Sequence, residues 1–446
     1  MNDSLRRRWP LDIDEKLAEL IPKRMAERGR ITMDSLLAPI KDVLNRRKFP
    51  EKSLADDQIE LMFRLLSSMD TDKDPSAARV GEREGRVASP YISQLAAGFN
   101  HGIGRSGRVT APQPKAPGAS LMQQIANTVA LDAMKSLGLP NVKAGIVLPL
   151  ATGMTIGLVL SALRSEYSFD TVLHPRLDHS SPMKGIALTG LDIVTTPTVL
   201  EGDAVRADLV KLEEEVSKRK SCAILATTTF FPPRESDPVK DISRLCSDED
   251  IPLVINNAYG VQSEAVMARL QSAIDAGRVD AIVQSSDKNF LAPVGASILV
   301  SPREETVEQT AERYAGRASA APVVQTLAAL LALGLERYKI LRDKQLENKR
   351  VLDSKLTEIA ESVGQRVLSV ENPVASAMTL DGLDAKDLGG RLYNLRVTGP
   401  RAIPKGAYGS CIDNYPHSYL VMNAAIGTSR SDIENATAKL FKEVSG

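Results

Sequence analysis

One lysine, Lys288, has a setting that could give its amine a chemical role. It follows the apolar run 281–283 and precedes the apolar run 296–300, within a segment of small and polar residues. This order predicts a short turn between two buried strands, where burial lowers the pKa of an amine and frees its lone pair. Such an amine can form a Schiff base with pyridoxal phosphate. A lone lysine in a strand loop is more commonly a surface residue, so other residues must decide.

Three further groups could bind such a cofactor. Ala151, Thr152 and Gly153 form a turn between a strand and a helix, and their amides and hydroxyl could hold a phosphate. Asn256 ends a buried strand and could hydrogen-bond a pyridine nitrogen, although it supplies no counter-charge. His179 lies in a polar turn where its ring could stack on the pyridine. Alone, these are a helix cap, a strand-end turn and a capping histidine; together they favour pyridoxal phosphate.

A stretch without acidic residues could bind an anion. The 47 residues from 85 to 131 contain no Asp or Glu, which preserves a positive field around their cations. Within it, Arg105, Ser106 and Gln113 occupy a loop bounded by glycines and prolines, which could present a guanidinium and two neutral donors to a phosphate. Arg83 lies just before this stretch. Arg317, in a later turn, could bind a carboxylate, a phosphate or a carbonyl group, or could simply cap a helix.

The same loop contains a formal Gly-x-Gly-x-x-Gly pattern at residues 102–107, which is not a dinucleotide site. No apolar strand leads into it, and Pro112, Pro114 and Pro117 prevent the helix that would have to follow directly.

The elements that must position these residues follow from apolar periodicity. Helical patterns alternate with short apolar runs from about 120 to 300, which predicts a doubly wound, mostly parallel α/β sheet with helices on both faces. The expected strands are 144–148, 171–173, 193–194, 222–225, 253–255, 281–283 and 297–300, and the expected helices outside this region are 13–28, 33–44, 56–69 and 323–347. We expect a helical N-terminal extension over 1–80, a large catalytic domain over 81–330, and a bridging helix with a small α+β domain over 331–446.

Composition sets further bounds. A chain of 446 residues that is 43% hydrophobic can bury a large core, and its 56 basic and 56 acidic residues balance. It has no apolar run of membrane-spanning length, and the basic start lacks the apolar core of a signal peptide. The three cysteines and four histidines show neither disulfide nor metal spacing. We therefore expect a cytosolic protein without a metal or a membrane anchor.

Ten segments resemble the O-phosphoseryl-tRNA:selenocysteinyl-tRNA synthase family. They occur in order at 81–89, 101–107, 113–115, 151–154, 200–203, 256–263, 287–290, 293–295, 316–320 and 414–416. The resemblance implies the fold type I architecture of pyridoxal phosphate enzymes and a homotetramer, a dimer of dimers with active sites at subunit interfaces. It also implies conversion of O-phosphoseryl-tRNA to selenocysteinyl-tRNA with selenophosphate, by β-elimination of phosphate and addition of selenium. The sequence ends without the longer tail of animal members, which favours an archaeal-type member.

The resemblance also assigns residues. It makes Lys288 the Schiff-base lysine and Asn256 the partner of the pyridine nitrogen. The group that would hold the substrate phosphate is Arg83, Arg105, Ser106 and Gln113, with Arg317 also in the active site. The glycine-rich loop would reach into the neighbouring subunit. Arg108 stands where animal relatives carry Asp and would strengthen the field, and His179 stands where they carry Gln.

A tRNA contact is expected at two places. Residues 1–48 hold 12 basic and 8 acidic residues, and the cations at one helix end could contact acceptor-arm phosphates. These cations are Lys41, Arg46, Arg47 and Lys48. Arg401 matches the family's arginine near the discriminator base. An ordinary solvated helix end remains the alternative for the first group.

Two other functions remain open. The chain could be a different pyridoxal phosphate enzyme, either a cysteinyl-tRNA-forming relative or a β-lyase of free amino acids. It could also be a non-catalytic scaffold that binds tRNA, although the retained Lys288 argues against this.

Overall fold

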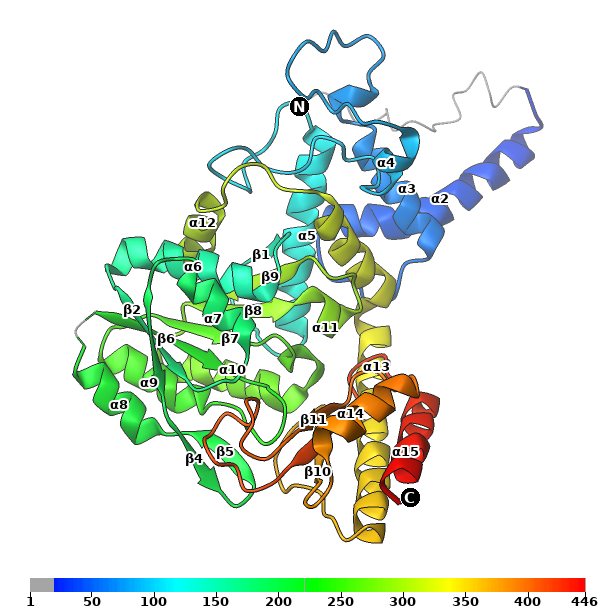
Figure 1. Ribbon diagram of the computed structural model, residues 1–446. Coiled ribbons are helices and arrows are strands. Elements are labelled where there is room, and N and C mark those ends of the chain that lie inside the picture. The colour runs from blue at the N-terminus through cyan, green and yellow to red at the C-terminus, as the bar shows by residue number, and fades with distance from the viewer. Residues whose placement is uncertain (1–19, 220, 446) are drawn as a thin grey trace.

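A seven-stranded sheet organises the larger part of the computed structural model, which describes residues 20–219 and 221–445 (Figure 1). The strand order is β1-β9-β8-β7-β6-β2-β3. All pairings are parallel except those of β9, which runs antiparallel to β1 and β8. The strands are β1 (Ala144–Leu148), β2 (Thr171–Pro175), β3 (Asp192–Thr196), β6 (Cys222–Thr227), β7 (Leu253–Asn256), β8 (Ala281–Ser285) and β9 (Ser297–Ser301). Each predicted strand is present, and the mostly parallel sheet is confirmed.

Helices cover both faces of this sheet. The right-handed crossovers from β6 to β8 place α9 and α10 on one face, whereas the crossover from β2 to β3 runs the other way and places α7 with α6 on the opposite face (Figure 1). Because both faces are covered, the central strands are continuous apolar runs rather than alternating ones. The helices of this region are α5 (Pro117–Ser136), α6 (Thr152–Tyr167), α7 (Ser180–Ala187), α8 (Leu209–Ser217), α9 (Val239–Asp248), α10 (Glu264–Ala276), α11 (Ser286–Phe290) and α12 (Glu304–Glu312), with a 3-10 turn η3 (Gly260–Gln262).

A two-stranded hairpin of β4 (Thr198–Glu201) and β5 (Ala204–Ala207) was not expected from the sequence. Its strands are short and β4 is largely solvent-accessible, so no apolar run marks it. Val205 is fully buried and packs with residues of the small C-terminal sheet. The hairpin therefore joins the large sheet region to the C-terminal region.

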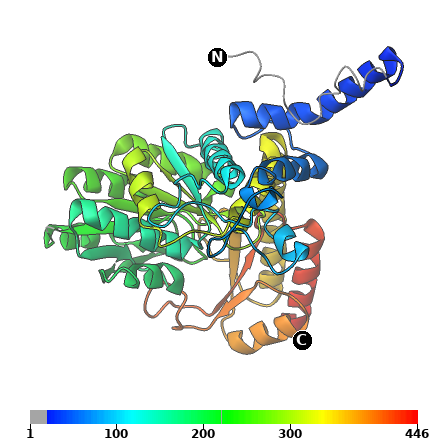
Figure 2. The same cartoon turned by 90° about the horizontal axis from the view of Figure 1, so that it is seen from above.

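The N-terminal elements are α2 (Lys23–Arg46), α3 (Asp56–Ser67), the 3-10 turn η2 (Thr71–Lys73) and α4 (Pro90–Gln94). The expectation of two helices separated near residue 30 is wrong, because α2 continues through Gly29 and Pro39. A glycine in a helix costs only about 1 kcal/mol, which does not end it. Residues 13–19 of the first expected helix lie outside the described part. Figure 2 shows α2 projecting from the body of the molecule.

One long helix, α13 (Ala321–Ser362), crosses from the large core to the C-terminal region. It breaks at Gly334, where φ is +60°. At the break, the amide of Leu335 donates to the carbonyl of Pro50 at 2.9 Å, and the amide of Leu54 donates to the carbonyl of Leu331 at 2.9 Å. The N-terminal segment 50–54 therefore supplies hydrogen bonds that an unbroken helix would make within itself.

The C-terminal region contains a three-stranded antiparallel sheet of order β10-β12-β11. Its elements are β10 (Ala375–Thr379), β11 (Arg401–Ile403), β12 (Tyr419–Asn423), α14 (Ala385–Asn394) and α15 (Arg430–Ser445). These helices and the end of α13 form its own apolar core. The N-terminal helices, by contrast, share the large core, and α13 crosses residue 330. The expected domain limits at 80 and 330 stay a prediction.

Candidate active site

The carboxyl ends of five strands meet at one edge of the large sheet. The strands β2, β6, β7 and β8 are parallel, and β1 is parallel to β8 because both run antiparallel to β9. Gly153, His179, Asn256 and Lys288 each come at or just after such an end. This edge is where ligands bind in open α/β sheets. The structure therefore brings the predicted cofactor residues to one edge.

Lys288 lies in the single-turn helix α11, directly after β8, rather than in an open turn. Its amine lies 4.5 Å from the centre of the Tyr259 ring. Burial lowers the pKa of Lys288, and the neighbouring carboxylate of Asp287 acts in the opposite direction. Within the described chain, the amine forms no ion pair. A partly dehydrated amine without a carboxylate partner can be neutral near physiological pH and act as a nucleophile or base.

Two side-chain amides fix α11 against the segment that follows β7. Asn289 donates to the carbonyls of Ala258 and Ser285, at 2.8 Å each. Gln262 donates to the carbonyl of Lys288 at 3.3 Å. These bonds hold the lysine backbone in a fixed position relative to the end of β7.

Asn256 occupies that end of β7 and is buried. Its side-chain oxygen accepts from the amide of Ala258 at 3.3 Å, while its amide nitrogen has no hydrogen bond within the described chain. That nitrogen is a free donor for a ring nitrogen. The hydroxyl of Ser286, two residues before Lys288, is also buried and without a partner among the described residues. Unpaired buried polar groups beside the amine fit a bound polar cofactor.

The turn at Ala151, Thr152 and Gly153 begins α6, and no side chain caps its first amides. A Cβ atom on Gly153 would lie 2.4 Å from the Ser181 hydroxyl, so only glycine allows α6 to approach α7 here. His179 precedes α7 directly. The uncapped amides and the His179 turn are therefore adjacent, as a site for a phosphate and its attached ring requires.

An aromatic cluster continues from the amine toward the small sheet. Tyr259 contacts Phe231, with ring centres 6.0 Å apart, and Phe231 contacts Phe230 at 5.2 Å. The Arg401 guanidinium stacks on Phe231 at 4.4 Å. His179 contacts Phe230 at 5.7 Å, and burial lowers its pKa, with the charges of Lys288 and Arg401 acting in the same direction. Arg401 therefore belongs to the surroundings of the amine.

A second group of cations lines a cavity of about 530 Å³, which we call the anion pocket. It lies between the loop that follows residue 81 and the loop that precedes α13. The cations and the imidazole that border it are Arg83, Arg86, Arg317 and His101. One acid, Glu82, also lines it but is strongly exposed, and its carboxylate lies 4.0 Å from Arg83 Nε. The cavity is thus predominantly cationic.

Backbone contacts fix the two loops of the anion pocket together. Ile103 and Ala318 exchange both backbone hydrogen bonds, at 3.0 and 3.1 Å. Gly102 makes this approach possible, because its φ is +69° and a Cβ atom there would lie 2.4 Å from the Ala318 carbonyl oxygen. Arg317 is therefore held against the glycine-rich loop.

Arg105 and Ser106 do not line the anion pocket but lie in an exposed turn of that loop, in which Arg105 and Arg108 exchange backbone hydrogen bonds at 3.1 Å. Gln113 is half-buried, and its backbone amide donates to Ser120 at 2.9 Å. Among the described residues, neither Arg105 nor Arg317 forms an ion pair. Their charges are therefore free to bind an anion.

Other cations of the acid-free stretch are compensated. Arg108 pairs with Glu312 at 3.3 Å and with Glu308 at 3.7 Å, and Lys115 pairs with Glu84. The expectation that Arg108 strengthens the field is therefore wrong, because α12 supplies two carboxylates to it. The sequence could not show this, since these acids lie some 200 residues later.

The anion-binding residues and the amine are not joined within one chain. In the described part, no hydrogen bond, ion pair or ring contact links Lys288 to Arg83, Arg105 or Arg317. The structure thus forms two groups, one around the amine and one around the anion pocket.

The basic group at the end of α2 is exposed. Lys41 pairs with Asp34 at 3.2 Å and Arg46 with Asp42 at 2.8 Å. Arg47 and Lys48 follow the helix without an ion pair among the described residues. In residues 20–219 and 221–445, no cluster of metal-binding side chains occurs and no helix is long and apolar enough to cross a membrane.

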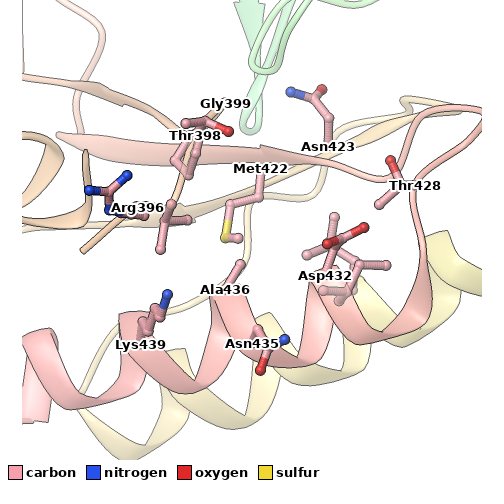
Figure 3. A pocket seen from close by; sticks show the side chains of 14 residues that line it. Arg396, Thr398, Gly399, Met422, Asn423, Thr428, Asp432, Asn435, Ala436 and Lys439 are labelled. Atoms are coloured by element: carbon pink, nitrogen blue, oxygen red, sulfur yellow. The ribbon is translucent and has the colours of Figure 1, made fainter. Parts of the chain in front are cut away.

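A further cavity of about 660 Å³ lies in the C-terminal region, between α15, β12 and the segment before Arg401 (Figure 3). Arg396 and Lys439 border it, and Met422 and Ile433 form part of its apolar floor.

Sequence reasoning missed several residues of these sites. Tyr259 and Ser286 were within recognised segments, but the ring–amine contact and the unpaired hydroxyl appear only in three dimensions. Phe231 and His101 likewise acquire their positions through contacts between distant segments. The position of His101 within the acid-free stretch was the one available signal.

Comparison with known proteins agrees with the resemblance. The family model of O-phosphoseryl-tRNA(Sec) selenium transferase matches residues 69–445. The O-phosphoseryl-tRNA(Sec) selenium transferase of Methanococcus maripaludis is 43% identical over 437 residues, covering 96% of this chain and 99% of that protein. The crystal structure of an archaeal O-phosphoseryl-tRNA(Sec) selenium transferase gives a TM-score of 0.94 at 42% identity, covering 98% of this chain and 100% of the other.

A more distant match supports the fold class. A Burkholderia pseudomallei sphingosine-1-phosphate lyase gives a TM-score of 0.60 at 16% identity, covering 89% of this chain and 92% of the other. The expected fold type I architecture of pyridoxal phosphate enzymes is confirmed by these structural matches.

Proposed function

The chain belongs to the O-phosphoseryl-tRNA(Sec) selenium transferase family and converts O-phosphoseryl-tRNA(Sec) to selenocysteinyl-tRNA(Sec), and we propose that Lys288 and the anion pocket divide this work. Lys288 would carry out the proton chemistry with pyridoxal phosphate, and the pocket would bind the phosphate of the substrate and then selenophosphate. The observation that carries this proposal is the combination of a partly buried amine without an ion pair and two arginines, Arg105 and Arg317, that form no ion pair among the described residues.

The residues of the sheet edge would hold the cofactor. Lys288 would bind it covalently, Asn256 Nδ2 would donate to its ring nitrogen, and His179 would contact its ring. The phosphate would meet the first amides of α6 at Ala151, Thr152 and Gly153, which no side chain caps. When bound, pyridoxal phosphate supplies an electron sink for negative charge at the substrate α-carbon.

The amine of Lys288 would act as the base for the α-proton. Burial lowers its pKa, so a larger fraction is neutral near physiological pH than for an exposed lysine. The Tyr259 ring lies against the amine and limits its positions. A fixed, neutral amine can take up a proton at Nζ and return it later in the reaction.

The arginines would stabilise the negative charge of the departing phosphate and of the incoming selenophosphate. Arg83, Arg105 and Arg317, with the neutral donors Ser106 and Gln113, would bind phosphate and then selenophosphate. Fixed guanidinium groups act on developing charge without reorganisation, an effect that can be worth a few kcal/mol. The use of one pocket for both anions is supported by the similar charge and shape of the two groups.

The exposed position of Arg105, together with the family relationship, supports a homotetramer, a dimer of dimers, in which the loop with Arg105 serves the amine of a neighbouring subunit. Exposed apolar side chains on α2, among them Met25 and Ile31, support further contacts between subunits. Mixing Lys288→Ala and Arg105→Ala subunits tests this arrangement. Shared sites restore activity in the mixed assembly, whereas sites within single subunits restore none.

The tRNA would lie along the exposed cations of the α2 end and near Arg401. Arg47 and Lys48 would contact backbone phosphates together with Lys41 and Arg46, and Arg401 would contact the end of the tRNA near the amine. Residues 396–400, which directly precede Arg401, form one wall of the cavity in Figure 3, and its cations Arg396 and Lys439 would extend this surface. Replacing Arg47 and Lys48 by Gln should weaken tRNA binding and reduce the salt slope by about two. An unchanged slope would refute this contact.

The test of the function incubates cofactor-loaded protein anaerobically with O-phosphoseryl-tRNA(Sec) and selenophosphate and identifies the amino acid on the tRNA. Selenocysteine supports the proposed donor. Cysteine formation with a sulfur donor alone favours a cysteinyl-tRNA-forming enzyme, and turnover of free O-phosphoserine favours a β-lyase. A cytoplasmic location is proposed because the substrate is an aminoacyl-tRNA, and recovery of the protein only with membranes would contradict it.

A further inference from the structure

His101 is buried beneath the anion pocket and is paired with one carboxylate. Its side chain is 1% exposed, and its Nε2 lies 3.6 Å from Asp72 Oδ1, which is 3% exposed by side chain. Neither atom has a hydrogen-bond partner among the described residues. The distance is beyond a hydrogen bond but within an ion pair. A small movement would bring the two atoms into hydrogen-bond contact, and their burial without partners lowers the stability of the fold.

The other oxygen of Asp72 is fully engaged. It accepts from Lys73 at 2.6 Å and from the Asn100 side chain at 2.8 Å. Lys73 also donates to the carbonyl of Gly98 at 2.7 Å. These bonds anchor Asp72, so it presents Oδ1 to His101 from a fixed position.

All the loops that carry the pocket arginines meet at this pair. Gly85, between Arg83 and Arg86, has a φ of +66°, and a Cβ atom there would lie 2.6 Å from Asp72 Cβ and 2.9 Å from His101 Nε2. On the other side, His101 directly precedes Gly102, which packs on the loop of Arg317. The imidazole is therefore surrounded by the walls of the pocket.

We propose that His101 takes up a proton when an anion enters the pocket, and that the imidazolium is then held between Asp72 and the bound anion. This inference rests on the proposed function of the pocket, which it deepens by adding a titratable cation to the permanent arginines. It would also set a pH dependence on anion binding that arginines alone cannot give. A proton from solvent is the only species added.

The charges around His101 support this behaviour. In the empty pocket, burial lowers the pKa of His101, the charges of Arg317 and Lys73 lower it further, and Asp72 and Glu84 raise it. The imidazole is therefore neutral before binding at neutral pH. An anion beside Arg317 offsets that repulsion and favours the charged form.

The experiment measures sulfate binding to the cofactor-loaded, full-length protein by calorimetry at pH 6, 7 and 8. Sulfate resembles phosphate but does not titrate in this range, and two buffers of different ionisation enthalpy report the protons taken up. We expect net proton uptake and a several-fold gain in affinity from pH 8 to pH 6, because a pKa rise of about one unit gives about tenfold only over the complete titration. His101→Gln should abolish both, whereas His417→Gln, in a different region, should change neither.

The outcomes separate this inference from the proposed function. Sulfate binding that Arg317→Ala abolishes, but that takes up no proton, overturns the role of His101 and leaves the anion pocket standing. Binding that is indifferent to Arg317→Ala overturns both. If His101→Gln does not fold, the proton uptake of the unchanged protein still decides, and Asp72→Asn should reduce it because the imidazolium loses its carboxylate partner.

Discussion

The amine of Lys288 and the anion pocket are held in opposite ways. Lys288 follows a buried strand, its backbone is held by neighbouring side-chain amides, and burial lowers the pKa of its amine. The pocket is built from loops with glycines in left-handed conformations, and its arginines keep their charges because no strong carboxylate partner meets them. The comparison indicates that a regular sheet suits one precisely placed reactive group, whereas loops suit the convergence of several charges from distant segments.

The largest effect is expected at the amine. Lys288→Ala removes both the covalent attachment point and the base, so formation of selenocysteinyl-tRNA should fall by about 10³-fold or more. The assay measures product on the tRNA and the absorbance of the bound cofactor. Lys184→Ala, an exposed lysine on α7, is the control. Substantial turnover by Lys288→Ala would assign the base to another residue.

The next effect sharpens the account of charge on the glycine-rich loop beside the anion pocket. Arg105→Ala should lower both phosphate release from O-phosphoseryl-tRNA and consumption of selenophosphate by about 10²-fold, because it removes an uncompensated cation. Arg108→Ala, three residues away, should cost only a few-fold, since Glu308 and Glu312 already offset its charge. Equal losses in the two variants would show that compensation is irrelevant. Unchanged selenophosphate consumption by Arg105→Ala would contradict the proposal that one site binds both phosphate and selenophosphate.

The loop construction can be tested with two glycines. Gly102→Ala should lower the free energy of unfolding by about 3 kcal/mol and abolish sulfate binding, because the new methyl would collide with the Ala318 carbonyl. At Gly107 φ is +92°, but no atom lies within 4 Å of an added Cβ atom. Gly107→Ala should therefore lower the free energy of unfolding by only about 1 kcal/mol. Denaturant unfolding and calorimetry supply the measurements. Similar losses would mean that close approach is not what Gly102 provides.

The smallest effect concerns a buried carboxylate at the start of α5. Asp70 accepts from the amides of Gly118 and Ala119 at the start of α5, and burial raises its pKa to about 6. Since the folded state then binds more protons than the unfolded state, stability should fall as pH rises from about 4 to 6. Asp70→Asn keeps the acceptor without the charge. It should remove this fall and raise stability at pH 7 by about 1 kcal/mol.

Unfolding by denaturant at pH 4.5 and 7 measures the effect. Asp74→Asn is the control. Hydrogen bonds from Ser76 lower the pKa of this exposed carboxylate, so removing its charge should leave the loss of stability that Asp70 causes in place. A decline that persists in Asp70→Asn would assign it to another group.

The two regions also differ in what their sequences reveal. The seven strands were predictable because covering both faces of a sheet requires apolar runs, and the positions of Asn256 and Lys288 at strand ends followed from them. The anion pocket was predictable only as a list of cations. Arg108 forms an ion pair with a carboxylate of α12, and Lys115 forms one with Glu84. No local sequence pattern shows which cations are paired in this way.

The boundaries of helices show the same limit. The sequence predicted a break near Gly29, between the expected helices 13–28 and 33–44, but α2 is continuous there. In α13 the opposite occurs: Gly334 marks a real break, but its hydrogen bonds come from the segment 50–54, which sequence periodicity cannot identify.

The hydrogen bonds between segment 50–54 and α13 have a consequence for the order in which the chain can fold. The segment 50–54 leaves the ribosome early, yet its partners at Leu331 and Leu335 are made some 280 residues later. The bonds between this segment and α13 therefore cannot form until α13 has been synthesised, although the N-terminal helices can already pack on α5, and α13 cannot close its break alone. Formation of these bonds is a late step of folding, after which the cations at the C-terminal end of α2 stand in a fixed relation to the helix that carries the C-terminal sheet.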